Sequence, residues 1–152
     1  MIATDRLRNL IALHEGRVPY AYQDSLGYWT IGIGHLIDRR KGGRLPEEII
    51  DALFAYDLHA HAQPLHTALP WLARLDDVRR AVLIDMAFNL GVAGLLTFRV
   101  TLECVRVGAY AEAARNMLRS RWASQVKTRA VRLARMMQTG EWPPELADDT
   151  EP

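Results

Sequence analysis

The stretch Glu15–His35, EGRVPYAYQDSLGYWTIGIGH, is the part of the sequence around which the rest is organised. Two carboxylates, Glu15 and Asp24, stand on either side of a short extended run, and the hydroxyl of Thr30 follows on the next extended run. Cleavage of a glycosidic bond needs a carboxylic acid that donates a proton and a carboxylate that activates water or attacks the sugar. Most pairs of acids at this spacing are surface charge, so the prediction rests on the whole stretch.

The same stretch predicts a β-hairpin. Val18–Tyr22 has strand character, and Pro19 near its start marks it as an edge strand. Residues 24–27, with the sequence DSLG, are typical of a turn. Tyr28–Gly34 then forms the partner strand.

Alternation along the second strand places Thr30, Gly32 and Gly34 on one face, which Tyr28 shares. The glycines alone would indicate only an irregular strand. Together with the hydroxyl, they form a bare face that a bulky sugar can approach closely, so Tyr28 and Gly32 are candidate substrate contacts. The opposite face carries Trp29, Ile31, Ile33 and His35.

Two helices are expected to flank the hairpin. Residues 4–14 show apolar side chains at helical spacing, and Gly16 is a natural stop. Glu15 thus lies at the C-terminal end of a helix, where the dipole disfavours negative charge, as suits a proton donor. A second helix is predicted at residues 47–66, where Pro64 should bend or end it.

The remainder is predicted to be mostly helical. Asp76 or Asp77 can cap a helix that Gly91 ends, and its part Ala81–Leu90 is apolar nearly all round, as in the buried centre of a helical domain. Three more helices are expected, namely Leu95–Val107, Ala109–Ser120 and Thr128–Thr139, with a break around Trp122–Lys127. The acidic, proline-rich tail 141–152 is expected to fray.

The composition fits one domain with a real core, since 49% of the 152 residues are hydrophobic. Net charge is +1, but seven basic and no acidic residues lie between Ala113 and Gly140, which indicates either a solvated helical surface or a face for a polyanion.

No apolar run approaches the roughly 20 residues of a membrane-spanning helix. We therefore expect synthesis in the cytoplasm; if the polysaccharide that the protein cuts is cell wall, another factor must release the protein. The spacing of His59, His61 and His66 does not favour a metal site, and no cofactor is expected.

At this point the motifs resemble a known family. The order HEG, short strand, then D-S-x-G-Y-x-T-x-G-x-G-H is similar to the phage-type lysozymes, the T4 lysozyme-like endolysins of glycoside hydrolase family 24. The similarity continues at VRRAVLIDMAFNLG and at SRWASQVKTRAVRLARMMQTGEW, and therefore covers most of the chain.

The resemblance implies a single α+β lysozyme domain over residues 1–152, with a cleft between a small β-hairpin lobe and a larger helical lobe. The small lobe would span about 15–46, the connecting helix about 47–66, and the helical lobe 1–14 with 67–140. The family implies a monomeric enzyme that hydrolyses the β-1,4 bond between N-acetylmuramic acid and N-acetylglucosamine in bacterial peptidoglycan, with inversion, for host lysis. Neither a nucleic-acid partner nor stable membrane insertion is expected.

Carried onto matching positions, the resemblance makes Glu15 the general acid and gives Asp24 with Thr30 the task of holding the water. Asn89 and Trp122 are candidate substrate contacts, although Trp122 fits a core position better and Asn89 could instead bond to it. Three further residues would support the site. His35 would pair with Asp57, and Arg129 would lie close to Glu15.

Three departures from the family pattern stand out. The segment between His35 and Leu53 is short, Pro64 interrupts the connecting helix, and Val126–Ala130 lacks the usual proline. Two rival interpretations also remain. A lytic transglycosylase needs only the glutamate, and the basic run would suit a non-catalytic module that binds wall polymer or nucleic acid.

Overall fold

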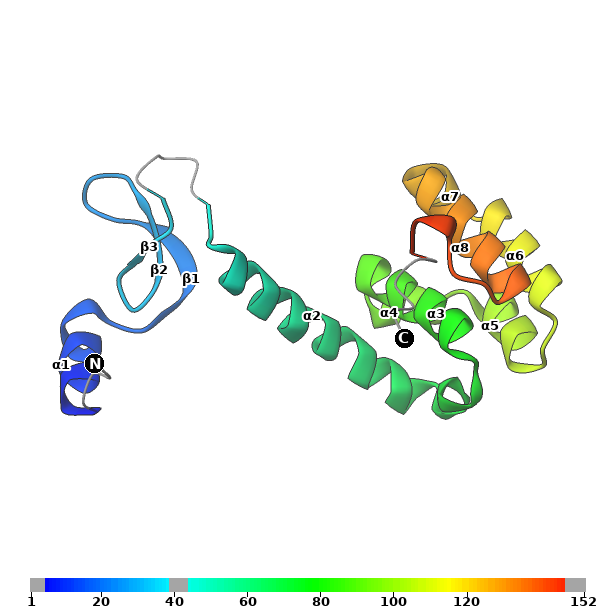
Figure 1. Ribbon diagram of the computed structural model, residues 1–152, viewed down its shortest axis with the longest axis horizontal. Coiled ribbons are helices and arrows are strands. Elements are labelled where there is room, and N and C mark those ends of the chain that lie inside the picture. Colours follow the sequence, from blue (N-terminus) through cyan, green and yellow to red (C-terminus); the bar gives the residue numbers. More distant parts are fainter. Residues whose placement is uncertain (1–4, 39–43, 147–152) are drawn as a thin grey trace. The chain divides into compact units, whose positions relative to one another are not determined.

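The computed structural model describes residues 5–38 and 44–146 and divides into two compact units, Met1–Phe54 and Ala55–Pro152 (Figure 1). The first unit contains a helix and a small sheet, and the second is helical. The predicted α+β class is therefore confirmed. The finer division into lobes, including the placement of residues 1–14 with the helical lobe, stays a prediction.

In the first unit, helix α1 (Asp5–Glu15) precedes a three-stranded antiparallel sheet of order β1-β2-β3. The helix ends as predicted, because Gly16 takes φ 78° and its N–H donates to the carbonyl of Ala12 at 2.9 Å. The strands are the following: β1 (Val18–Gln23), β2 (Trp29–Gly32) and β3 (His35–Leu36). Tyr22 pairs with Thr30 across the first hairpin.

The second predicted strand is too long. It ends at Gly32, and a turn at residues 33–34 leads into β3, a strand that the sequence pattern did not predict. The physical reason is that Gly32 and Gly34 both have positive φ, 71° and 64°, so the chain reverses where alternation alone predicted extension. The expectation that Gly34 shares a strand face with Thr30 is therefore wrong.

Helix α2 (Glu47–Ala68) crosses the boundary between the units. It starts after Pro46, whose carbonyl accepts the N–H groups of Ile49 and Ile50. It does not end at Pro64, although a proline there cannot donate to the carbonyl one turn earlier. The wholly buried Leu65, whose carbonyl accepts the N–H of Leu69 at 2.8 Å, anchors the last turn.

The helical unit surrounds one hydrophobic core, to which α3, like α8, contributes five buried side chains. Four of its side chains, Val82, Leu83, Met86 and Ala87, are fully buried, as its apolar sequence predicts. Figure 1 shows α5, α6 and α8 on one side of this unit, and α6 packs on both α5 and α8. The elements are η1 (Pro70–Arg74), α3 (Asp77–Leu90), α4 (Val92–Leu96), α5 (Arg99–Arg106), α6 (Tyr110–Arg119), α7 (Arg121–Val126), α8 (Thr128–Thr139) and η2 (Pro144–Leu146).

Two helix predictions in this unit are wrong. Leu95–Val107 is not one helix. The hydroxyl and the N–H of Thr97 both donate to the carbonyl of Gly94, at 2.7 and 3.2 Å, and these hydrogen bonds end α4. The predicted break around Trp122 is instead the helix α7, whose first turn is capped by the hydroxyl of Ser120. The break comes at Lys127, with φ 50°, an angle that the proline usual in the family cannot adopt.

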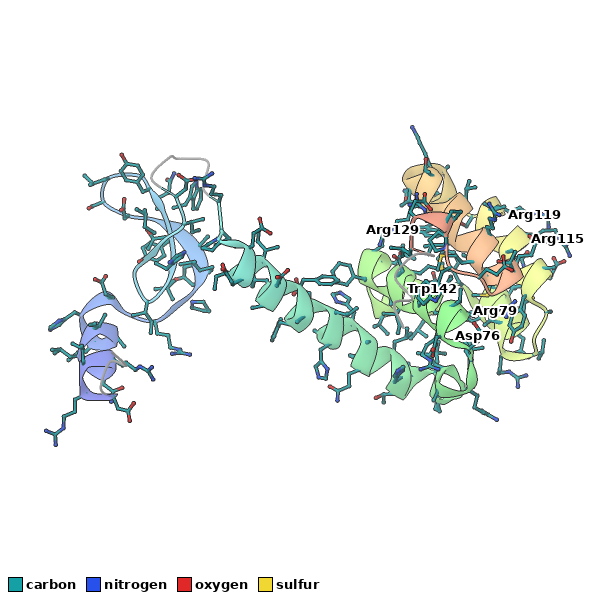
Figure 2. All side chains as sticks on the ribbon, viewed as in Figure 1. Asp76, Arg79, Arg115, Arg119, Arg129 and Trp142 are labelled. Atoms are coloured by element: carbon teal, nitrogen blue, oxygen red, sulfur yellow. The ribbon has the colours of Figure 1, made fainter. Side chains whose placement is uncertain are left out.

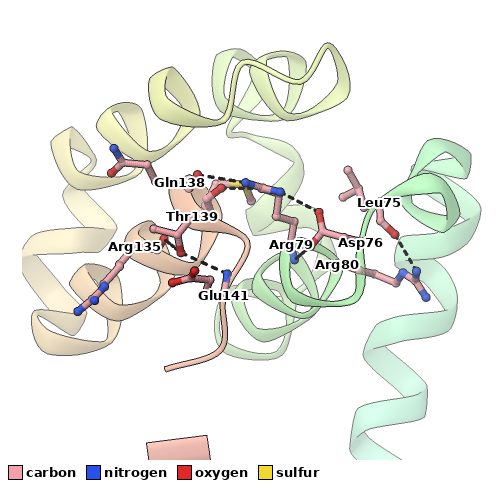
Figure 3. A network of polar contacts seen from close by, with 9 residues as sticks. Leu75, Asp76, Arg79, Arg80, Arg135, Gln138, Thr139 and Glu141 are labelled. Atoms are coloured by element: carbon pink, nitrogen blue, oxygen red, sulfur yellow. Dashed lines mark hydrogen bonds and ion pairs between the residues drawn. The ribbon is translucent and has the colours of Figure 1, made fainter. Parts of the chain in front are cut away.

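Arg79 fastens the end of α8 to the start of α3 (Figure 3). Its guanidinium donates to the carbonyls of Met137 at 2.7 Å and Gln138 at 3.1 Å, and pairs with Asp76 at 3.0 Å. The same group stacks over the ring of Tyr110, 3.7 Å from the centroid. A Cβ at Gly140 would lie 2.8 Å from the guanidinium, so the predicted stop at Gly140 also makes room for it.

Asp76, one of the two predicted caps, accepts the N–H of Arg79 at 2.9 Å and begins α3. Burial raises the pKa of Asp76, but the hydrogen bonds and the charge of Arg79 outweigh it and hold this pKa below its usual value. The ionised carboxyl therefore stabilises the fold above a pH of about 4, and this contribution disappears as pH falls through the lowered value.

Replacement of Asp76 by asparagine should therefore lower the melting temperature at pH 7, because the cap remains but the charge is lost. The difference from the wild type should shrink as the pH falls through the lowered pKa of Asp76, because both side chains are neutral below it. Thermal unfolding of both proteins, followed by circular dichroism from pH 7 downward, would test this. A constant difference would contradict the assigned role of the charge.

The first part of the tail does not fray. Pro143 is buried, η2 follows it, and Glu145 pairs with Arg132 of α8 at 3.0 Å. The expectation of a loose tail is wrong for residues 141–146, because the apolar ring of Pro143 and one ion pair hold it on α8. The part of the tail beyond Leu146 lies outside the described residues.

Candidate active site

Glu15 is the last residue of α1, and its side chain is exposed. Its carboxyl lies against Gly34, in the turn between β2 and β3: a Cβ at Gly34 would be 2.6 Å from Oε2 and 2.8 Å from Cδ of Glu15. Any larger residue at position 34 would therefore push this carboxyl away. The two ends of the predicted stretch are thus brought together by a contact, and the second glycine makes room for the candidate proton donor.

The carboxyl of Asp24 is fixed by the turn that it starts. Its Oδ1 accepts the N–H groups of Leu26 and Tyr28, each at 2.9 Å, and its own N–H donates to the carbonyl of Tyr28 at 2.9 Å. Gly27, with φ 83°, completes the turn. These bonds use Oδ1 only, so the second oxygen can accept a hydrogen bond from water or from a sugar.

Thr30 is connected to the same turn. Its hydroxyl donates to the carbonyl of Tyr28 at 3.3 Å, and this carbonyl also accepts the N–H of Asp24. Three predicted residues are therefore joined through backbone and side-chain hydrogen bonds. Thr30 is only 6% exposed, so its face is less open than the sequence predicted. Gly32 is open, since a Cβ there would meet no atom within 4 Å.

In the helical unit, the indole N–H of Trp122 donates to the Asn89 side-chain oxygen at 2.8 Å. Trp122 is 3% exposed and meets the ring of Phe98 edge-on, 6.2 Å between centroids. Of the two partners that the sequence left open for Asn89, the structure shows Trp122. The indole itself is a core side chain, and a substrate contact through Asn89 stays a prediction.

A profile of the family described as Phage lysozyme matches residues 12–136, a range that contains all three candidate catalytic residues. The chain belongs to the phage lysozyme family. It is 32% identical to the protein called probable T4-type lysozyme 1 of Dictyostelium discoideum, over 88% of this chain and 94% of that protein. It is 25% identical to probable T4-type lysozyme 2 of the same organism, with the same coverage. The pre-baseplate central spike protein Gp5 of phage T4 is 27% identical over 88% of this chain, but over 28% of its own length.

Membership of the phage lysozyme family makes the chain a glycoside hydrolase and implies peptidoglycan as its substrate. It also confirms the resemblance noted from the motifs. Within the described ranges, no helix is both long and apolar enough to cross a membrane. Residues 5–38 and 44–146 also contain no cluster of three or more histidine, cysteine or acidic side chains placed to hold a metal ion.

One partner of a predicted supporting residue, Arg129, was not found from sequence. Asp85 on α3 accepts a hydrogen bond from Nε of Arg129 at 2.9 Å, and its carbonyl lies 3.4 Å from Nη2 (Figure 2 labels Arg129). The sequence did contain a signal that Asp85 has a special role. It is the only charged residue in the apolar run Ala81–Leu90 and precedes Asn89 by one helical turn.

Two predicted pairs join residues of different units. His35 on β3 and Asp57 on α2 are both exposed, and the same division separates Glu15 from Arg129. Because each pairing joins residues of two units that are described separately, both pairings stay predictions. The backbone carbonyl of Asp57 bonds within its own unit to Nδ1 of His61, whose ring lies 5.1 Å from that of Phe88.

Proposed function

We propose that this enzyme hydrolyses the β-1,4 bond between N-acetylmuramic acid and N-acetylglucosamine, with inversion, and so lyses bacterial cells. The observation that carries the proposal is the pair of differently placed carboxyls in the first unit. Among residues 5–38 and 44–146, the exposed Glu15 side chain takes part in no hydrogen bond, whereas Asp24 accepts two backbone N–H groups. The Asp24 carboxyl is thus held in place to position water, whereas the Glu15 carboxyl can turn toward a leaving oxygen, and glycosidic hydrolysis needs both.

In the proposed reaction, Glu15 transfers its proton to the leaving glycosidic oxygen as the bond to the anomeric carbon breaks. Water attacks that carbon from the opposite face and gives up a proton to Asp24. The turn holds Asp24 in place through Oδ1, so Oδ2 can accept the hydrogen bond from this water. Thr30, joined to the same turn through the carbonyl of Tyr28, orients the water from the neighbouring strand.

The sugar is proposed to approach over the open side of Gly32, where no atom blocks it, with Tyr28 beside it. A transglycosylase would need only Glu15, because the sugar's own hydroxyl attacks in place of water. The ordered carboxyl of Asp24 favours hydrolysis, since a transglycosylase has no use for a group that holds water.

The basic run gives less support to a nucleic-acid-binding module. Of its seven cations, Arg115 pairs with Glu112, Arg129 with Asp85 and Arg132 with Glu145. At least three charges are thereby balanced locally, which favours a solvated helical surface over a binding face for a polyanion.

Digestion of purified peptidoglycan, with the products analysed by mass spectrometry and NMR, tests the proposal. We expect free reducing N-acetylmuramic ends that first appear as the α anomer. A 1,6-anhydro product is lighter by one water, and a majority of such fragments would assign the enzyme to the transglycosylases. Initial β anomers would instead make Asp24 a nucleophile in a retaining reaction.

A further inference from the structure

The helical unit has a cavity of about 380 Å³ between α8 and the segment that follows it. The volume lies within the usual range for sites that bind small molecules. Its walls come from α8 on one side and from residues 141–145 on the other, so docking of the tail creates it. The lining residues that matter here are Arg132, Arg135, Met136, Glu141, Trp142 and Glu145.

The cavity combines an apolar base with an accessible aromatic ring. Met136 is 6% exposed and Pro143 is buried, whereas Trp142 is 45% exposed (Figure 2). The core can bury an indole completely, as Trp122 shows at 3%. Nearly half of a large apolar ring therefore remains in water beside a cavity, where a ligand with an apolar face can cover it.

The polar groups around the ring carry balanced charge. Arg132 and Arg135 supply two positive charges, and Glu141 and Glu145 supply two negative ones. The N–H of Glu145, with the hydrogen bond from Arg132 and the charges of both arginines, lowers the pKa of its carboxyl, which stays ionised at neutral pH. A polyanion would gain little here, while a neutral ligand with many hydroxyl and amide groups finds both donors and acceptors.

We propose that this cavity is a second, non-catalytic binding site for the N-acetylated sugars of the wall glycan. The inference rests on the proposed function for its choice of sugar. The indole of Trp142 covers the apolar face of one sugar ring, and the planar groups of Arg135 and Glu141 bond to its hydroxyl and acetamido groups. Figure 3 shows Arg135 with its side chain extended beside Glu141 at the end of α8.

A second site has a physical use on an insoluble polymer. An enzyme held by two contacts stays close to the glycan after each cleavage, because release of one contact leaves the other in place. Even a weak sugar site thereby raises the fraction of enzyme bound to the wall.

Co-sedimentation of the full chain with purified peptidoglycan sacculi tests the inference, with the Glu15→Gln variant as background so that the polymer is not degraded. We expect Trp142→Leu to weaken binding about fivefold or more, and Arg135→Ala, which removes an exposed side chain, to weaken it about twofold or more. Val107→Ser is the matched control, because Val107, which directly follows α5, is 59% exposed and lies outside the cavity. Affinity equal to that of the background for both cavity variants would overturn the proposal.

NMR provides a second readout that needs no substitution in the cavity. Titration with a tetramer of N-acetylglucosamine, a neutral probe, should shift the indole N–H resonance of Trp142 in the Glu15→Gln background. No shift at millimolar probe would overturn the proposal, as would a shift only with polyglutamate. Failure of the proposed function appears differently, as the absence of peptidoglycan cleavage by the wild-type enzyme.

Discussion

A Glu15→Gln variant is expected to lose essentially all lytic activity while keeping its fold. Proton donation by a positioned side chain typically contributes about 10²–10⁴ to the rate, and an amide cannot donate the proton that the leaving oxygen requires. Stability should change little, because Glu15 is exposed and the amide has the same shape. Clearing of outer-membrane-permeabilised bacteria measures the activity, and thermal unfolding measures the fold.

The matched control is Glu48→Gln, which changes another exposed glutamate of the same unit, in the first turn of α2. This variant should clear bacteria at the wild-type rate. A folded Glu15→Gln protein that did the same would remove Glu15 from its role as the general acid.

The largest loss of stability is expected for Arg79→Met. Methionine keeps most of the side-chain volume but removes the bonds to Met137, Gln138 and Asp76 and the contact with Tyr110. Because the side chain of Arg79 is only 15% exposed, this should cost about 3 kcal/mol of unfolding free energy. For a chain of this length, the melting temperature should fall by about 6–12 °C.

Arg115→Met is the control for that prediction. Arg115 pairs with Glu112 on the surface of α6 and is 57% exposed, so its loss should change the unfolding free energy by less than about 0.5 kcal/mol. Urea unfolding of the two variants side by side would compare them. Equal effects would show that Arg79 does not fasten α8 to α3.

Features determined by nearby residues could be predicted from the sequence. The stop of α1 at Gly16, the turn begun by Asp24, the cap by Asp76 and the buried face of α3 all depend on residues within one or two turns of the chain. The candidate acid and its two partners could be proposed from sequence for the same reason, since they lie within sixteen residues of one another. Their motif is short and continuous.

What the sequence missed depends on contacts between distant segments. Arg79 reaches carbonyls 58 and 59 positions away, and Arg129 reaches Asp85 across 44 positions. Lateral pairing with β2, rather than any strong propensity of its own, makes a strand of His35–Leu36. A helical pattern also does not reveal that the hydroxyl of Thr97 donates to the carbonyl of Gly94, a bond that ends α4 before α5 begins.

The location of buried apolar side chains sets the order in which the chain can fold. Between residues 5 and 38 and between 44 and 54, no apolar side chain is buried, whereas the core of the helical unit extends from Leu65 to Met137. Folding requires enough apolar burial to offset the loss of chain entropy. The part of the protein that carries Glu15 and Asp24 is synthesised before the helical unit, yet the buried apolar side chains lie in the helical unit. A nascent chain arrested before α8 would therefore carry the candidate carboxyls Glu15 and Asp24 before the core of the helical unit could be completed.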